Sequence, residues 1–95
     1  MKVRVSELRR AANVLFDHLE RLGHAEIEVD SDYYWSIPNE KLYSVYEDPS
    51  DFTVGQLSED LENVKAIVAG TKVPIAYGLV WLSTLLRFIG SKISA

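Results

Sequence analysis

The chain has 95 residues, 47% of them hydrophobic and 25% charged, values typical of one small globular domain rather than a disordered chain. Because it contains no cysteine, disulfides, thiolate catalysis and thiolate zinc sites are excluded. Fourteen acids outweigh ten bases, for a net charge of −4 and a pI of about 5.0. This balance argues against nucleic acid as the main partner, because binding to phosphates depends on Lys and Arg.

The first predicted element is an amphipathic helix. Ser6 is a suitable N-cap, apolar residues recur at steps of three and four from Leu8 to Leu22, and Gly23 suits the position after a helix. We therefore expect a helix of about four to five turns. Charged residues are scattered through the first ten positions, so we expect no signal peptide and a cytoplasmic protein.

The next segment has the alternation of a strand. Apolar and polar residues alternate from Ile27 to Ile37, but no second strand-like run is evident to pair with them. The triplet Asp30-Ser31-Asp32 also suits the cap of a short helical turn over Tyr33 to Ser36. We therefore expect an extended piece over 26–29 followed by a turn, with a strand over 27–37 as the alternative.

Two further helices are predicted in the middle of the chain. Pro38 suits the first turn of a short helix, which Asp48-Pro49 ends. Thr53 and Gln56 then form a capping-box pattern ahead of apolar residues at steps of three and four. This pattern predicts a helix from there to about residue 69, closed by Gly70.

The last predicted helix is apolar around most of its circumference. It opens at Pro74, and apolar residues follow at steps of four and three as far as Ile93. The run from Val73 to Ile89 has one charge, Arg87, but its 17 residues span only about 25 Å, less than a hydrocarbon core of about 30 Å. We therefore expect a helix that is central in the core or shared with a partner, and no membrane anchor.

The charges are segregated along the chain. Residues 26–62 contain eleven acids and one base, whereas the segments on either side are net basic. The same acidic segment holds six of the ten aromatic residues. An acidic field selects cationic partners and speeds encounter, while Tyr and Trp supply rigid contact area. We therefore predict a partner-binding surface made of Asp30, Asp32, Tyr33, Tyr34, Trp35, Glu47, Asp48, Asp51, Glu59 and Asp60. In the alternative interpretation the acids are a solvated face and the aromatics belong to the core.

No pattern of metal ligands or catalytic groups accompanies this segment. His18 and His24 match no metal-ligand spacing, and Asp30-x-Asp32 begins like a calcium loop but has Trp35 where that loop needs glycine. A pair of carboxylates could act as acid and base, yet the chain is small and shows neither an activated nucleophile nor a phosphate-binding glycine loop. We predict no metal, no cofactor and no enzymatic activity.

Most of the chain resembles known proteins, through motifs that lie in the acidic segment. Residues 32–38, Asp-Tyr-Tyr-Trp-Ser-Ile-Pro, followed by residues 55–60, Gly-Gln-Leu-Ser-Glu-Asp, are similar to a family of small, uncharacterised bacterial proteins with the signature D-Y-Y-W-x-I-P … G-Q-L-x-D-D. That resemblance covers most of the chain and implies no particular activity. In size, acidity and adjacent tyrosines before a proline, the chain also resembles the immunity proteins of nuclease bacteriocins, which implies a basic toxin as the partner.

The sequence thus predicts an all-α fold in a single domain over residues 1–95, a small bundle of three long helices and one short helix with an extended acidic connection; an α+β fold is the alternative. The predicted function is binding and inhibition of a basic, nuclease-like toxin, without nucleic acid or membrane as partner. The alternative is a structural or regulatory subunit that assembles through the apolar C-terminal helix, as a homodimer using Leu79, Leu82 and Leu86.

Overall fold

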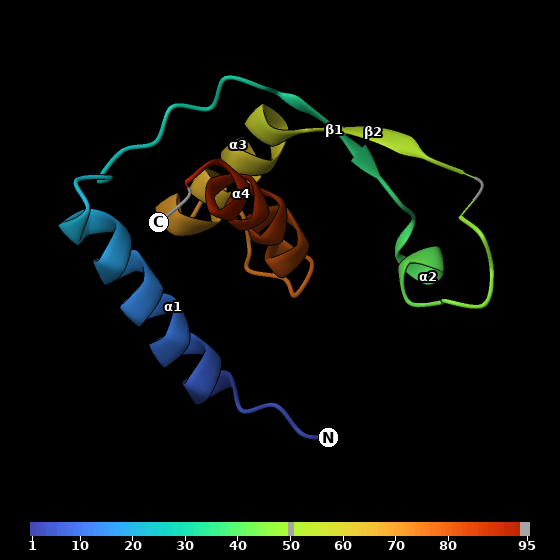
Figure 1. The fold of residues 1–95 in the computed structure, drawn as a ribbon, viewed down its shortest axis with the longest axis horizontal. Helices are drawn as coiled ribbons and strands as arrows, with labels where there is room; N and C mark the ends of the chain where they lie inside the picture. The colour runs from blue at the N-terminus through green and yellow to red at the C-terminus, as the bar shows by residue number, and fades with distance from the viewer. Residues whose placement is uncertain (50, 94–95) are drawn as a thin grey trace.

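The computed structural model describes residues 1–49 and 51–93. Its elements follow in the order α1 (Val5–Arg21), β1 (Tyr33–Ser36), α2 (Asn39–Leu42), β2 (Thr53–Gln56), α3 (Leu57–Ala69) and α4 (Gly78–Lys92). The chain is therefore mainly helical, as predicted, but it also contains a two-stranded sheet that the all-α prediction missed (Figure 1). The α+β alternative was correct in placing a strand within residues 27–37, although that strand is only four residues long.

Helix α1 is the element that local sequence predicts best. It spans 17 residues and ends where expected, with Gly23 at a φ of 90°, a left-handed conformation that glycine adopts without steric cost. The predicted cap is wrong, because Arg4 holds the extended N-cap position and Ser6 lies inside the first turn. From Gly23 the chain runs without helix or strand to β1. The extended piece expected over 26–29 is therefore irregular connection.

Strands β1 and β2 pair as a two-stranded ribbon, and each lies where the sequence predicted the beginning of a helix or helical turn. The strands are antiparallel, with Tyr34 opposite Gly55 and Trp35 opposite Val54. The capping box of Thr53 and Gln56 was therefore a wrong interpretation, and so was the helical turn over 33–36. β-Branched and aromatic residues pack well across a pleated pair, and here they gain cross-strand partners that a helix would not provide.

The short helix α2 covers only Asn39–Leu42, so the predicted helix as far as Asp48 ends several residues early. Pro38 is its N-cap residue, in agreement with the expected start of this helix next to the proline. The loop that follows returns the chain to β2 (Figure 1).

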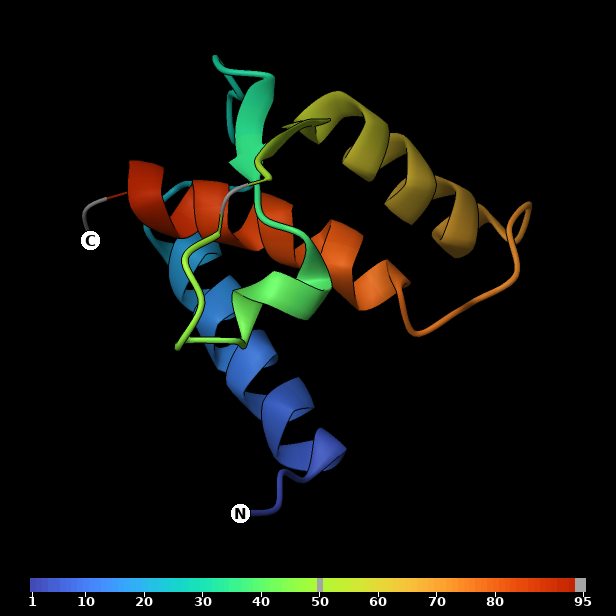
Figure 2. The same ribbon diagram turned by 90° about the vertical axis from the view of Figure 1, so that its right-hand side faces the viewer.

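Helices α3 and α4 pack side by side and form the centre of the fold (Figure 2). Helix α3 spans Leu57–Ala69, so it begins later than the predicted start at Thr53, and it is closed as predicted by Gly70, which has a φ of 81°. Helix α4 begins at Gly78, four residues after the predicted start at Pro74, because residues 76–77 form a turn. Within the described residues, no helix is both long enough and apolar enough to cross a lipid bilayer.

The core of the described chain is small. Leu57, at the start of α3, is 4% exposed and is the one hydrophobic residue classed as buried in residues 1–49 and 51–93. Helix α1 lies apart from the α3–α4 pair (Figure 1), and the radius of gyration is 15.1 Å, against about 12 Å for a compact chain of this length. The three long helices thus do not close into one tight bundle, and an apolar face of α1 stays open.

Candidate functional site

The two faces of the ribbon have different roles. Successive side chains of a strand point to opposite faces, so Tyr34 and Gly55 share one face while Tyr33, Trp35 and Val54 share the other. The first face turns toward α3 and α4, and the second is exposed. Tyr33 and Tyr34 are adjacent in sequence, and both were predicted to belong to the partner-binding surface. Because the strand is pleated, their side chains point to opposite faces of the ribbon.

Tyr34 anchors the inner face of the ribbon. Its hydroxyl donates a hydrogen bond of 2.7 Å to Oδ2 of Asp60 on α3, and the same oxygen accepts one of 2.6 Å from the Thr84 hydroxyl on α4. Asp60 is only 7% exposed, so its carboxylate needs these donors. Burial raises the pKa of Tyr34 to about 12, and the bond to Asp60 and the charge of Asp60 act in the same direction. One carboxylate thus joins β1, α3 and α4.

Glycine is required opposite Tyr34. A Cβ placed on Gly55 would lie 2.2 Å from Cζ of Tyr34 and 2.5 Å from its hydroxyl oxygen. These distances are far below van der Waals contact, so any side chain at this position displaces the ring. Gly55 therefore lets the phenol cross the ribbon and reach Asp60.

Asp32 caps helix α3 from a distant part of the sequence. Its Oδ1 accepts a bond of 2.8 Å from the backbone N–H of Ser58, and its Oδ2 accepts one of 3.0 Å from the Ser58 hydroxyl. The backbone oxygen of Asp32 also accepts a bond of 2.7 Å from the N–H of Leu57. The first N–H groups of a helix lack partners within it, and a negative charge there is favourable. Asp32 therefore has a structural role.

The outer face of the ribbon is an exposed aromatic surface. Tyr33 is 67% exposed and Trp35 is 76% exposed, and Phe52 and Val54 beside them are also exposed. The rings of Trp35 and Phe52 meet edge to face with centroids 6.2 Å apart. A shallow pocket of about 230 Å³ is lined by Tyr33, Tyr34, Trp35 and Val54. We call Tyr33, Trp35, Phe52 and Val54 the ribbon face.

Two of the remaining predicted acids lie at the surface next to the ends of the ribbon. Asp30, ahead of β1, forms an ion pair of 3.4 Å with Lys92, which also donates to the backbone oxygen of Glu28. Asp51 is exposed just ahead of β2, and because the strands are antiparallel it lies at the opposite end of the ribbon from Asp30.

The other three predicted acids are also exposed, but they lie in the loop after α2 and in α3. Glu47 pairs with Lys41 at 2.9 Å, and Asp48 follows it in the same loop. Glu59 is exposed in the first turn of α3, where an acid favours the helix dipole. The structure therefore separates the ten predicted residues into an inner set that holds the fold, Asp32, Tyr34 and Asp60, and an outer set that faces solvent.

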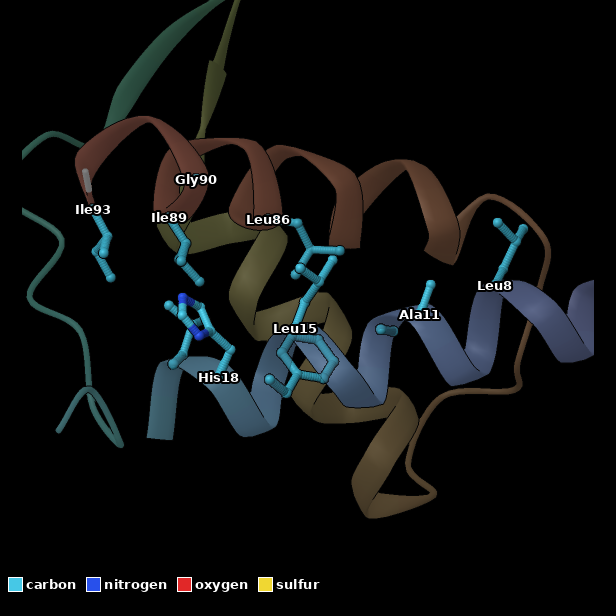
Figure 3. A pocket seen from close by; sticks show the side chains of 11 residues that line it. Leu8, Ala11, Leu15, His18, Leu86, Ile89, Gly90 and Ile93 are labelled. Atoms are coloured by element: carbon cyan, nitrogen blue, oxygen red, sulfur yellow. The ribbon is translucent and has the colours of Figure 1, made fainter. Parts of the chain in front are cut away.

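The apolar residues of α4 that were predicted to assemble a dimer differ in exposure. Leu79 is exposed near the start of α4, Leu82 is partly buried, and Leu86 faces α1. Between α1 and α4 lies an apolar groove of about 500 Å³ (Figure 3), in which Leu15 points toward Leu86 and His18 toward Ile89.

Sequence reasoning missed three residues on which the site depends: Val54 on the ribbon face, Gly55 beneath Tyr34, and Thr84 on Asp60. The strand tendency of Thr53 and Val54 was the available signal for the first two, but the capping-box pattern concealed it. Nothing local marks Thr84, because its contact depends on the packing of α4 against α3. Over residues 1–49 and 51–93, no three His, Asp or Glu side chains are grouped so as to hold a metal ion.

Comparison with protein-family models, with curated proteins and with solved structures finds no match to this chain. The functional argument therefore depends on the side chains and contacts described above.

Proposed function

We propose that this protein is a binding module for a basic protein, in the manner of an inhibitor or immunity protein for a nuclease-like toxin, and that the ribbon face is its contact surface. The observation that carries the proposal is the exposure of Tyr33 and Trp35 on β1, the same strand whose half-buried Tyr34 is hydrogen-bonded to Asp60. Tyr and Trp dominate the energetics of protein interfaces because they bury large areas with few rotatable bonds.

The charges around the ribbon favour a cationic partner. Asp30 and Asp51 stand at opposite ends of the ribbon, and the segment 26–62 that contains both strands has ten more acids than bases. Carboxylates at the rim of an interface act mainly on the rate of encounter and on the choice of partner, whereas central aromatics supply the affinity. The proposed contact set is therefore Tyr33, Trp35, Phe52 and Val54, with steering by Asp30, Glu47, Asp48, Asp51 and Glu59.

The first test is affinity capture from a lysate of the source organism at low and at high salt, with the bound proteins identified by mass spectrometry. We expect a stoichiometric basic protein that loads more fully at low salt. Recovery of no basic protein under either condition would contradict the proposal.

The contact surface is then tested with the captured partner in pure form. Trp35→Ala should weaken binding about 30-fold or more if Trp35 is a central anchor, a loss of about 2 kcal/mol. The matched control is Tyr46→Ala, because Tyr46 is a fully exposed aromatic outside the strands, in the loop after α2. Asp51→Lys should slow association and reduce its salt dependence, while Glu62→Lys on α3 should have a smaller effect. Equal affinity for Trp35→Ala and wild type would remove the ribbon face as the contact surface.

A structural or regulatory subunit is the second candidate function. The exposed apolar side chain of Leu79, at the start of α4, favours it. In that case Leu79→Asp abolishes assembly with the captured protein and Trp35→Ala leaves it intact, which is the reverse of the result expected above.

A further inference from the structure

Helices α1 and α4 carry apolar stripes with the same repeat. On α1 and its C-cap, leucines recur at intervals of seven residues, at Leu8, Leu15 and Leu22. On α4 and its C-cap, apolar residues recur at the same interval, at Leu79, Leu86 and Ile93. A seven-residue apolar repeat is the pattern with which two helices pack side by side. Yet no residue of α1 or α4 is buried, and Leu15, at the middle of the α1 stripe, is 62% exposed.

The two stripes already face each other in register. Leu15 points toward Leu86, and about one turn farther along both helices His18 points toward Ile89 (Figure 3). The residue numbers differ by 71 in both pairs (86 − 15 and 89 − 18), so the helices run in the same direction and their repeats are aligned. In a parallel pair of helices, equivalent positions of the two heptads are the ones that pack against each other.

The same offset matches the rest of the two stripes. It sets an apolar residue against an apolar residue in three further pairs, Leu8 with Leu79, Ala11 with Leu82, and Leu22 with Ile93. The charged residues of α1 lie away from its stripe, with Arg10 and Asp17 on the opposite side of the helix at 100° per residue. Contact between the two stripes therefore leaves these charges in water.

The contact between the stripes is incomplete. The groove of about 500 Å³ separates them, and in the described chain α1 does not pack against α4 as α3 does. Leu79, the counterpart of Leu8 near the starts of both helices, is 70% exposed and lies outside the lining of the groove. Moving the two helices together would remove apolar surface from water on both sides, which is favourable.

The connection after α1 allows this movement. Lys92, at the end of α4, donates a hydrogen bond to the backbone oxygen of Glu28 and forms an ion pair of 3.4 Å with Asp30, so the connection is attached to α4 from residue 28 onward. Between this attachment and the end of α1, residues 25–27 form no hydrogen bond with another described residue. A hinge is a few such residues that absorb the change in backbone angles.

From these observations we infer that α1 is a hinged arm that closes on α4: rotation about residues 25–27 brings the two stripes together in the register of Leu15 with Leu86, and the structure shows the open state. Closure adds α1 to the α3–α4 pair as a third packed helix. It covers Leu79 and Leu86, so the closed chain cannot use this face of α4 for assembly with another protein. The ribbon face is separate, and the inference therefore does not depend on the proposed function.

Disulfide trapping tests the closed register. The chain has no cysteine, so an introduced pair is unique, and a disulfide forms only where the two Cα atoms come within about 7 Å. Full-length protein with Leu8→Cys and Leu79→Cys should form a disulfide within one chain under mild oxidation, at a rate independent of protein concentration. The matched control combines Leu8→Cys with Leu86→Cys. Because this pair is one heptad, about 10 Å, out of register, it should cross-link at least about tenfold more slowly.

The radius of gyration tests closure without a cross-link. The open state has a value of 15.1 Å, and a compact chain of this length has about 12 Å. By small-angle X-ray scattering at low concentration, we expect the wild type to be about 1–2 Å smaller than Leu15→Asp, which places a charge in the stripe. The helix content of this variant by circular dichroism should be unchanged, because Leu15 is exposed in the open state. Val68→Asp, at an exposed apolar residue of α3, is the control and should match the wild type.

Three results would overturn the inference. The first is a pair at 8 and 86 that cross-links as fast as the pair at 8 and 79. The second is a disulfide between two chains rather than within one, which would place a second copy on the stripe. The third is an equal radius of gyration for the wild type and Leu15→Asp.

Discussion

The hydroxyl of Tyr34 lies 2.7 Å from the carboxylate of Asp60, 26 residues farther along the chain, and this hydrogen bond ties the ribbon to the helix pair. The same carboxylate accepts the hydroxyl of Thr84 from α4. Side chains from β1, α3 and α4 thus meet at the nearly buried carboxylate of Asp60. We therefore expect that removing either hydroxyl that donates to this carboxylate lowers the stability of the fold.

Tyr34→Phe should lower the free energy of unfolding by about 1.5 kcal/mol, because it removes a hydrogen bond to a charged acceptor and leaves Asp60 with one donor fewer. Urea denaturation followed by circular dichroism measures the change. Tyr33→Phe is the control, since Tyr33 is exposed and its variant should stay within about 0.5 kcal/mol of wild type. Equal stability of the two variants would contradict the role of the Tyr34 hydroxyl.

Gly55→Ala should destabilise the protein by about 1–3 kcal/mol, because the new methyl group collides with the Tyr34 ring and displaces it from Asp60. In a Tyr34→Ala background the same change should cost much less, since the colliding ring is gone. Gly90→Ala on α4 is the control: its Cβ meets no atom within 4 Å, and alanine should raise helix stability by up to about 1 kcal/mol. A loss at Gly55 that is unchanged in the Tyr34→Ala background would show that the ring is not its cause.

Asp32→Ala should lower stability by about 1–2 kcal/mol, because it removes the cap from the N-terminus of α3. Asp30→Ala is a matched control two residues away, where the carboxylate forms an exposed ion pair with Lys92 worth at most about 1 kcal/mol. Thermal unfolding monitored by circular dichroism compares the two. A greater loss in Asp30→Ala than in Asp32→Ala would contradict the capping role.

The stability of the protein should fall as the pH rises from about 10 toward 12. The pKa of Tyr34 is about 12 in the folded chain and 10 in its ordinary state, so the folded protein keeps a proton that the unfolded chain loses. The contribution of Tyr34 is therefore complete below pH 10 and is lost as the pH approaches 12. The absorbance of phenolate in the folded protein, followed during an alkaline titration, should show one tyrosine that ionises late.

The same titration of Tyr34→Phe should lack the late component. A late-ionising tyrosine that persists in this variant would assign the raised pKa to another residue.

Features that depend on neighbouring residues could be predicted from the sequence. The repeat of leucines defines α1, because a stripe at steps of three and four is amphipathic in any context. Gly23 and Gly70 both adopt positive φ where helices were expected to end. The segregation of acids into residues 26–62 is a property of the sequence alone.

Features that depend on distant residues were decided by the tertiary structure. The strand over Tyr33–Ser36 was doubtful because a strand needs a partner, and its partner, Thr53–Gln56, carried the pattern of a helix cap. The actual cap of α3 is Asp32, which is 26 residues before Ser58. Local patterns cannot identify such a donor and acceptor, because the packing of the ribbon brings them together.

The division of the candidate site has the same origin. The sequence by itself determined that aromatic and acidic residues are concentrated in one segment, since composition does not depend on conformation. Only the tertiary structure decided that Tyr34 and Asp60 hold the fold while Tyr33 and Trp35 face solvent. The physical reason is the pleat of the strand, which turns adjacent side chains to opposite faces and places one face of the ribbon on the helix pair.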